Sequence, residues 1–199
     1  MTAEQAAGFL LFSVAAAGTP GPSNVLLTAT GAHVGVLRGL PCLLGVALGM
    51  AAMMFSVSFG LGSAVLGRPD VLESVKWIGA AVLCWLAWKV ATARHGGRGA
   101  ARARPVGLVG AAVFQWVNPK SWIVSASAAA TFFDAAGASP LAESAALAIL
   151  FFLAAIPSCL PWLAFGAVLQ RILRSERAFR VFNVAMGLVM AASVLLILR

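Results

Sequence analysis

The chain has few charged residues, few histidines and few cysteines, and each shortage excludes a class of protein. Charged residues make up 10% of the 199 positions, against roughly 25% in a soluble domain. Cys42, Cys84 and Cys159 are far apart and form no CxxC pair, which argues against a disulfide framework or a redox relay and favours small-residue packing. His33 and His95 stand in or beside predicted loops without nearby ligand partners. The sequence therefore predicts neither a metal site nor a bound cofactor.

Apolar residues, by contrast, make up 61% of the chain, which predicts an all-α integral membrane protein. A spanning helix needs about 20 mainly apolar residues. Segments of that length predict six transmembrane helices, over residues 6–32, 40–66, 71–91, 106–133, 141–169 and 181–198. The third begins with Glu73 and Lys76, so its apolar core, residues 77–90, is short. Residues 1–8 lack the basic region of a signal peptide, so we expect the first segment to remain in the mature protein.

The net charge of +8 predicts an orientation in the bilayer rather than a nucleic-acid ligand, because the basic residues lie between apolar segments. Ten of the 14 lie after the first, third and fifth segments or, for Lys89, at the end of the third: Arg38, Lys89, Arg94, Arg98, Arg102, Arg104, Arg171, Arg174, Arg177 and Arg180. Arg68, Lys76 and Arg199 lie on the opposite side. The positive-inside rule makes the first group cytoplasmic and places both termini outside. Most of the acidic residues fall on the outer side, in agreement: Glu4, Asp70, Glu73, Asp134 and Glu143.

Two proline-containing stretches interrupt apolar segments. Residues 18–24, GTPGPSN, cannot continue a helix because Pro20 and Pro22 each remove a backbone donor and clash with the preceding turn. Asn118-Pro119-Lys120 interrupts the fourth segment in the same way. A membrane core offers no water to the freed carbonyls, so such breaks are expected only where they are buried in protein or line a wet cavity. The first and fourth helices are therefore predicted to be broken around a polar gap, although a simple kink is the alternative reading of the first.

The break at Pro22 would begin a new helix, whose free amides form an anion site beside Ser23 and Asn24. Lys120 is the one charged residue near the middle of a predicted span, a position that costs roughly 2.5–3.5 kcal/mol. We expect it to face the interior and to contact the carbonyls freed by Pro119, the amides of Gln115 and Asn118, and a bound carboxylate. The alternative is that Lys120 only caps the broken helix. Neither break contains Asp, Glu or His, so Lys120 is also the candidate proton carrier, since burial disfavours its ammonium.

Three helices per half is an odd number, so residues 1–93 and 106–199 would enter the membrane in opposite directions. This predicts a single transporter domain with a 3+3 inverted repeat. The connection, residues 94–105, is rich in Gly, Ala and Arg and is expected to be a flexible, basic, cytoplasmic loop. A nucleic-acid role for its arginines is the less favoured reading.

Other features favour structural roles. Pro157 and Pro161 share one helix face and predict a bend, and Gly45 and Gly49 predict close helix packing. Trp116 and Trp122 flank the second break and either wall the cavity or pack beside it.

Together these motifs resemble the LysE/RhtB family of bacterial amino-acid exporters over nearly the whole chain. TPGPSN at 19–24 is similar to the family's TPGPNN or TPGPD and is followed by a Gly-x-x-Arg-Gly turn, GVLRG at 35–39. KWIGAAVLCWLAWK at 76–89 resembles the third-helix block, and QWVNPKSWI at 115–123 the fourth-helix NPK motif. Ser23 replaces an Asn common in the family, and Val82 a Tyr. LAWKVAT at 86–92 and LQRILR at 169–174 are nearest the cysteine/O-acetylserine exporter subgroup.

The resemblance implies a multi-pass transporter of the bacterial cytoplasmic (inner) membrane that exports amino acids or small derivatives, driven by the proton-motive force, and is not an enzyme. The predicted partners are a small amino-acid substrate and the lipid bilayer, with monomer and homodimer both left open. The predicted substrate-binding residues are Pro20, Gly21, Pro22, Ser23, Asn24, Gln115, Trp116, Asn118, Pro119 and Lys120. The alternatives are a metal or small-ion permease, a membrane thiol-redox relay and a non-transporting helical scaffold.

Overall fold

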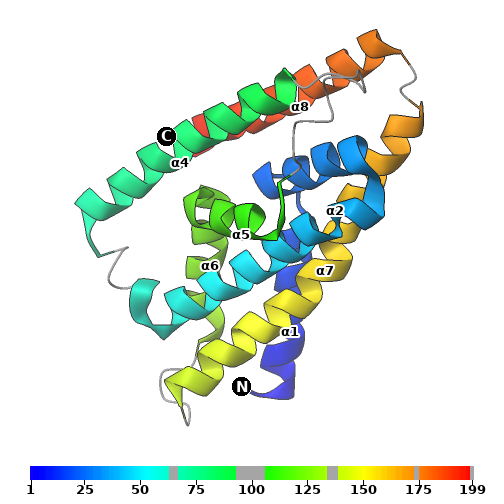
Figure 1. Ribbon diagram of the computed structural model, residues 1–199. Helices are drawn as coiled ribbons and strands as arrows, with labels where there is room; N and C mark the ends of the chain where they lie inside the picture. The colour runs from blue at the N-terminus through cyan, green and yellow to red at the C-terminus, as the bar shows by residue number, and fades with distance from the viewer. Residues whose placement is uncertain (63–66, 93–105, 134–138, 173–174, 198–199) are drawn as a thin grey trace.

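The protein is built from α-helices, with no strand in the part of the chain that the structure describes. A computed structural model describes residues 1–62, 67–92, 106–133, 139–172 and 175–197 (Figure 1). The helices are α1 (Ala3–Gly18), α2 (Pro22–Ser56), the π-helical turn η1 (Val57–Leu61), α4 (Pro69–Ala91), α5 (Leu108–Val117), α6 (Pro119–Phe132), α7 (Pro140–Ile172) and α8 (Glu176–Ile197). The predicted connection at 94–105 lies outside the described residues.

Both predicted helix breaks are present. α1 ends at Gly18, and α2 begins at Pro22 after an extended Gly21. α5 ends at Val117, and α6 begins at Pro119 after an extended Asn118. In each case the proline occupies the first helical position, where its missing N–H would have no partner anyway. The proline-directed interruptions are therefore confirmed as changes of backbone conformation.

The turn after the first segment is tighter than the sequence predicts. α2 continues past the expected loop at residues 33–39 and bends at one residue, Gly35, with φ 78° and ψ 177° (Figure 1). This backbone conformation is essentially restricted to glycine. The bend divides α2 into a short first part after the break and a longer second part, so the predicted second helix begins immediately after Gly35 rather than at Leu40.

Glycines set the closest helix contacts. A Cβ atom on Gly31 of α2 would lie 2.0 Å from the Leu163 carbonyl of α7, and one on Gly166 of α7 would lie 1.9 Å from the Thr28 carbonyl of α2. The predicted packing role of Gly45 and Gly49 is confirmed against α5, where added Cβ atoms would lie 2.2 Å from the Leu108 carbonyl and 2.5 Å from the Ala112 carbonyl. These backbones approach closely because no side chain separates them.

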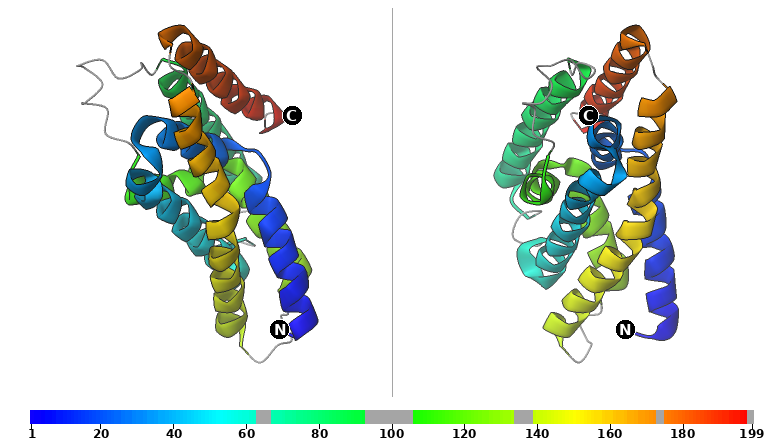
Figure 2. Two further views of the ribbon diagram at one scale, coloured as in Figure 1. Left: turned by 90° about the vertical axis from the view of Figure 1, so that its right-hand side faces the viewer. Right: turned by 45° about the vertical axis from the view of Figure 1, so that its right-hand side comes forward.

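α4 and α8 lie side by side along one edge of the molecule in each view (Figures 1 and 2). A Cβ on Gly187 of α8 would lie 2.7 Å from the Ala87 carbonyl of α4. The start of α1, the end of α6 and the start of α7 meet at one end of the molecule (Figure 1). There the Met1 amino group donates to Glu143 Oε1 at 2.5 Å.

The exterior carries many large apolar side chains, as a lipid-facing surface does; Leu11, Trp88 and Val109 are each more than 70% exposed. Among the described residues, Pro22–Leu61 and Pro140–Leu169 are long and apolar enough, by length and composition, to cross a membrane. Ala3–Gly18, Trp77–Ala91 and Leu108–Val117 are shorter apolar helices. The two breaks explain why Ala3–Gly18 and Leu108–Val117 are short, since each of these helices ends at a break.

Replacing Gly35 by Ala is expected to destabilise the protein by about 1–3 kcal/mol, because a Cβ is strained in this backbone conformation although the surrounding space is open. Thermal unfolding in detergent, followed by tryptophan fluorescence, measures the change. Gly8→Ala on α1, where the added Cβ would make an ordinary 3.6 Å contact, is the control and should leave the melting temperature unchanged or raised. Equal melting temperatures for Gly35→Ala and the wild type would show that the bend does not require glycine.

Candidate functional site

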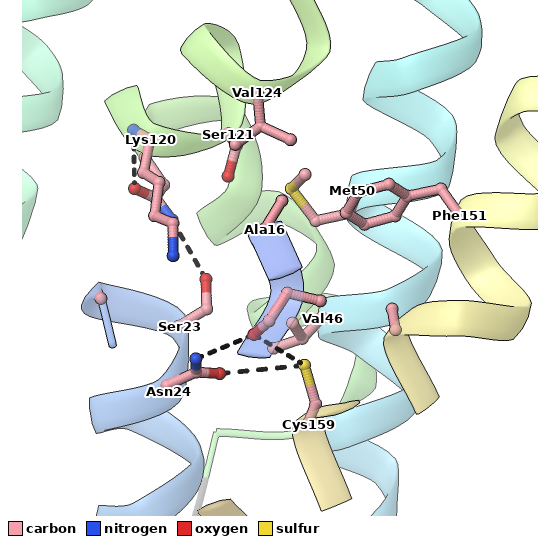
Figure 3. Close-up of a pocket in the computed structure, with 14 residues that line it drawn as sticks. Ala16, Ser23, Asn24, Val46, Met50, Lys120, Ser121, Val124, Phe151 and Cys159 are labelled. Atoms are coloured by element: carbon pink, nitrogen blue, oxygen red, sulfur yellow. Dashed lines mark hydrogen bonds between the residues drawn. The ribbon is translucent and has the colours of Figure 1, made fainter. Parts of the chain in front are cut away.

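A small cavity lies between the two helix breaks. Its lining residues come from α1, α2, α6 and α7 and from the breaks themselves: Ala16, Ala17, Gly21, Ser23, Asn24, Val46, Met50, Asn118, Lys120, Ser121, Val124, Phe151, Ala155 and Cys159 (Figure 3). The space open to the centre of a water molecule is about 30 Å³, against roughly 10–15 Å³ for one water. In this conformation the cavity has room for a few waters.

The carbonyls freed at the end of α1 are satisfied from within the protein. Asn24 Nδ2 donates to the Ala17 and Thr19 carbonyls, both at 2.9 Å. Trp162 Nε1, on α7, donates to the Gly18 carbonyl at 3.1 Å. Because an unpaired carbonyl is costly in an apolar environment, these donors permit the helix to stop there.

Lys120 joins the two breaks. From the first turn of α6 its Nζ donates to the Thr19 carbonyl at 2.7 Å. Its aliphatic part lies against Gly21, where an added Cβ would come within 2.9 Å of Lys120 Cδ. The carbonyl partner thus comes from the first break and not from the one that Pro119 creates. Within the described ranges the Lys120 ammonium forms no ion pair, so its charge is available to an anionic ligand.

A second network connects the breaks through Gln115. Its Oε1 accepts hydrogen bonds from Ser23 Oγ at 2.9 Å and Ser121 Oγ at 3.0 Å, while its Nε2 donates to the Ala111 carbonyl at 3.1 Å. Asn118 Nδ2 donates to Ser23 Oγ at 3.0 Å, and Asn118 Oδ1 caps α6 by accepting from the Lys120 amide at 3.2 Å. Gln115 is fully buried and is not a lining residue, so it acts by positioning Ser23 and Ser121, which do line the cavity.

The N-terminus of α2 opens toward the same cavity without a capping side chain. No residue in the described part of the chain accepts a hydrogen bond from the amides of Ser23 and Asn24 in this first turn. Free amides at a helix N-terminus carry partial positive charge and bind anions. Together with the Lys120 ammonium they make this end of the cavity electropositive.

The opposite end is apolar. Met50 of α2 and Phe151 of α7 face Lys120 and Ser23 across the cavity, with Ala16 and Val124 beside them (Figure 3). Cys159 lies next to Asn24, its Sγ 3.8 Å from Asn24 Oδ1 and 3.9 Å from the Ala17 carbonyl. The site therefore has a polar, cationic part, with Cys159 at its edge, and an apolar part that contains the Met50 sulfur.

The structure places five of the ten sequence-predicted site residues on the cavity lining: Gly21, Ser23, Asn24, Asn118 and Lys120. Pro20, Pro22, Gln115, Trp116 and Pro119 are not among the lining residues. Gln115 acts from behind, as described above. Trp116 packs edge-to-face on Trp122, whose Nε1 donates to the Trp116 carbonyl at 2.8 Å, and this pair contacts the Met53 and Val57 cluster.

Sequence reasoning missed Ser121, Cys159, Met50 and Phe151 as lining residues. Ser121 directly follows the NPK motif, which is the signal that could have identified it. Cys159 stands between Pro157 and Pro161, where the sequence favours a bend, and α7 runs as one helix through both prolines. The apolar members carried no signal in the sequence, because they resemble any other packing residue.

An all-helical protein with an apolar exterior and a small cationic cavity at two helix breaks belongs to the class of membrane translocation proteins. The profile described as "LysE type translocator" matches residues 14–198. The chain belongs to the LysE family of translocators and efflux proteins, which are membrane transporters.

Curated relatives agree with this assignment. The chain is 34% identical over 134 residues to the cysteine/O-acetylserine efflux protein of Salmonella typhimurium, covering 66% of this chain and 67% of the relative. It is 32% identical over 135 residues to the protein of that name from Escherichia coli K12, with the same coverage. No solved structure matches the chain.

The Gln115 network makes a prediction about stability. Gln115→Leu leaves the buried Ser121 hydroxyl without an acceptor, at a cost of about 1–3 kcal/mol, whereas the Ser23 hydroxyl keeps its bond from Asn118. Adding Ser121→Ala should recover part of this loss, because the stranded hydroxyl is removed with its partner. Thermal unfolding of the wild type, both single variants and the double variant completes the cycle. Strictly additive effects would contradict an energetic coupling between the two side chains.

Proposed function

We propose that the protein is a secondary active exporter of amino acids or small amino-acid derivatives across the bacterial cytoplasmic membrane, driven by the proton-motive force. The observation that carries the proposal is the Lys120 ammonium beside the uncapped N-terminus of α2, inside a cavity of a LysE-family protein. A free cation and free amides are suited to an α-carboxylate. Membership of the LysE family, which includes efflux proteins, supports the transport activity in this proposal.

In this proposal the substrate bridges the two breaks. Its carboxylate binds Lys120 Nζ and the amides of Ser23 and Asn24, while its ammonium binds oxygens of the unwound segments, such as the Thr19 carbonyl. Lys120 now donates to that carbonyl, so the substrate carboxylate would take over the lysine and leave the carbonyl for the substrate ammonium. Lys120 then caps the Thr19 carbonyl when the site is empty and binds the carboxylate when the substrate is present.

The apolar end of the cavity suggests the side chain of the substrate. Met50, Phe151 and Ala155 leave room for a small neutral group. No Asp or Glu is among the lining residues, so nothing there would compensate the charge of a cationic side chain next to Lys120. The named relatives are cysteine and O-acetylserine efflux proteins, and a short, neutral, polarisable side chain of that kind fits a lining that holds Met50 and Cys159.

The remaining parts of the proposal concern membrane topology. Six spans in a 3+3 inverted repeat, over residues 1–93 and 106–199, are supported by contacts between equivalent elements: the two breaks meet, the part of α2 after Gly35 packs on α7 where Gly39 meets Leu163, and α4 packs on α8. The distribution of basic residues supports termini that face outward. Alternating access would come from movement of one half against the other, with the present small cavity as a closed state.

Lys120→Met should reduce amino-acid counterflow about 10- to 100-fold, because a charge-assisted hydrogen bond to the carboxylate is lost. The transport rate is measured as counterflow of labelled amino acids into proteoliposomes, and testing a panel of amino acids identifies the substrate. Lys89→Met is the matched control: Lys89 lies 4.8 Å from the Trp85 ring on α4, away from the cavity, and its removal should leave counterflow unchanged. Wild-type rates for Lys120→Met, with normal membrane insertion, would remove Lys120 from the site.

Two of the cysteines, Cys159 and Cys84, provide an independent test of the site. A transported amino acid should slow alkylation of Cys159, which lines the cavity, and leave alkylation of the exposed Cys84 unchanged. Peptide mass spectrometry after timed exposure to a small maleimide reads each thiol separately. Equal protection of both cysteines would indicate a general conformational effect, and no protection at substrate saturation would place the substrate elsewhere.

A further inference from the structure

Buried hydroxyls without hydrogen-bond partners lie between the cavity and the end of the molecule where α1 and α7 begin. Ser125 on α6 and Ser144 on α7 are both fully buried, and neither Oγ has a partner in the described part of the chain. Glu143, next to Ser144, is also buried; its Oε1 accepts from the Met1 amino group, and its Oε2 has no described partner. Each unsatisfied buried hydroxyl destabilises the fold, so static packing gives no reason for these residues.

Helix geometry places these groups on the faces that line the cavity. Ser125 follows the lining residue Ser121 by four positions on α6. On α7, Ser144 precedes the lining residue Phe151 by seven positions. Residues four or seven apart share a helix face, so both serines continue the cavity lining by one or two turns. They extend it in the same direction, because the end of α6 and the start of α7 meet at one end of the molecule (Figure 1).

A phenylalanine cluster, Phe9, Phe12 and Phe132, fills the same region. The Phe9 and Phe132 ring centroids are 5.3 Å apart in an edge-to-face arrangement, and those of Phe12 and Phe132 are 5.7 Å apart. Phe9 lies seven positions before the lining residue Ala16 on α1, and so on the same face. The cluster packs against Phe151 and Met50, which line the cavity. Aromatic side chains therefore separate the cavity from this end of the molecule.

We propose that the substrate leaves along the interface of α1, α6 and α7, from the cavity to the start of α1. In this conformation the phenylalanine cluster closes the exit route. The Ser125 and Ser144 hydroxyls bind the zwitterion as it passes. The proposal rests on the function proposed above. Hydroxyls suit both ends of a zwitterion, because each can donate to a carboxylate and accept from an ammonium. The charge distribution places this end of the molecule on the outer side of the membrane.

The first experiment measures access to the route. Ser125→Cys and Ser144→Cys are labelled from the external solution of proteoliposomes with a membrane-impermeant thiol reagent, and each cysteine is read by peptide mass spectrometry. Adding Phe132→Ala should raise both labelling rates about tenfold, because loss of the ring contacts favours the open state. A transported amino acid should also change both rates. Phe132→Leu, which keeps an apolar side chain, should give a smaller increase and serves if the alanine variant does not fold.

Ser58→Cys is the matched control. Ser58 is also buried and its Oγ also lacks a described partner, but it lies in η1, outside the three helices that form the proposed route. Its labelling rate should respond neither to Phe132→Ala nor to the substrate.

The second experiment separates transport from packing. Ser125→Ala and Ser144→Ala should raise the melting temperature, or leave it unchanged, because an unsatisfied buried hydroxyl is removed. The same changes should slow counterflow severalfold if the hydroxyls contact the moving substrate. A purely structural role predicts unchanged counterflow.

The outcomes distinguish the two proposals. If the wild-type protein transports an amino acid but the two introduced cysteines behave like Ser58→Cys and both alanine variants transport normally, the exit route is wrong and the proposed function stands. If the wild type shows no counterflow with any amino acid, the proposed function fails and the exit route fails with it. Substrate-dependent labelling together with slow alanine variants supports both.

Discussion

The structure depends on one constraint, which is that backbone carbonyls released by a helix break inside an apolar protein need donors from elsewhere in the chain. At the first break three side chains supply them. Asn24 comes from the next helix, Trp162 from α7, and Lys120 from α6. Because α7 and α6 are distant in sequence, the break cannot be satisfied until the fold has assembled around it. The position of the cavity follows, since these donors converge where the two breaks meet.

The same groups complete the backbone and form the candidate binding site, so their two roles need to be distinguished. Lys120 as a cap alone would be fully used by the Thr19 carbonyl. That carbonyl, however, already accepts from Asn24 Nδ2 at 2.9 Å, and an oxygen with two lone pairs retains a partner if the lysine leaves. The lysine can therefore be withdrawn toward a carboxylate without leaving the carbonyl unpaired. This redundancy favours the reading in which Lys120 is a ligand-binding residue as well as a cap.

The sequence predicted what prolines determine locally and could not predict what distant helices determine together. Pro22 and Pro119 fix the first position of a helix through their own rings, so both breaks were predictable from neighbouring residues alone. The bond from Ser23 to Gln115 joins residues 92 positions apart, and nothing in either local pattern indicates the other. Phe151 and Met50 are part of the lining only because α7 and α2 bring those faces to the breaks. The one-residue bend at Gly35 was predictable as a turn, but its tightness depends on a backbone conformation that the residue type permits and does not require.

The two sides of the cavity differ in how they can move. On one side, α2 contacts α7 and α5 through glycine backbones, at Gly31, Gly166 and Gly45, and no side chain can rotate to open such a contact. On the other, α1 and α6 meet through the rings of Phe9 and Phe132, with centroids 5.3 Å apart. A ring can leave its position by rotation about two side-chain bonds, whereas separating the glycine contacts requires displacement of whole helices. The phenylalanine side would thus open with the least rearrangement of the fold, and it is the side of Ser125 and Ser144, whose hydroxyls have no partner among the described residues.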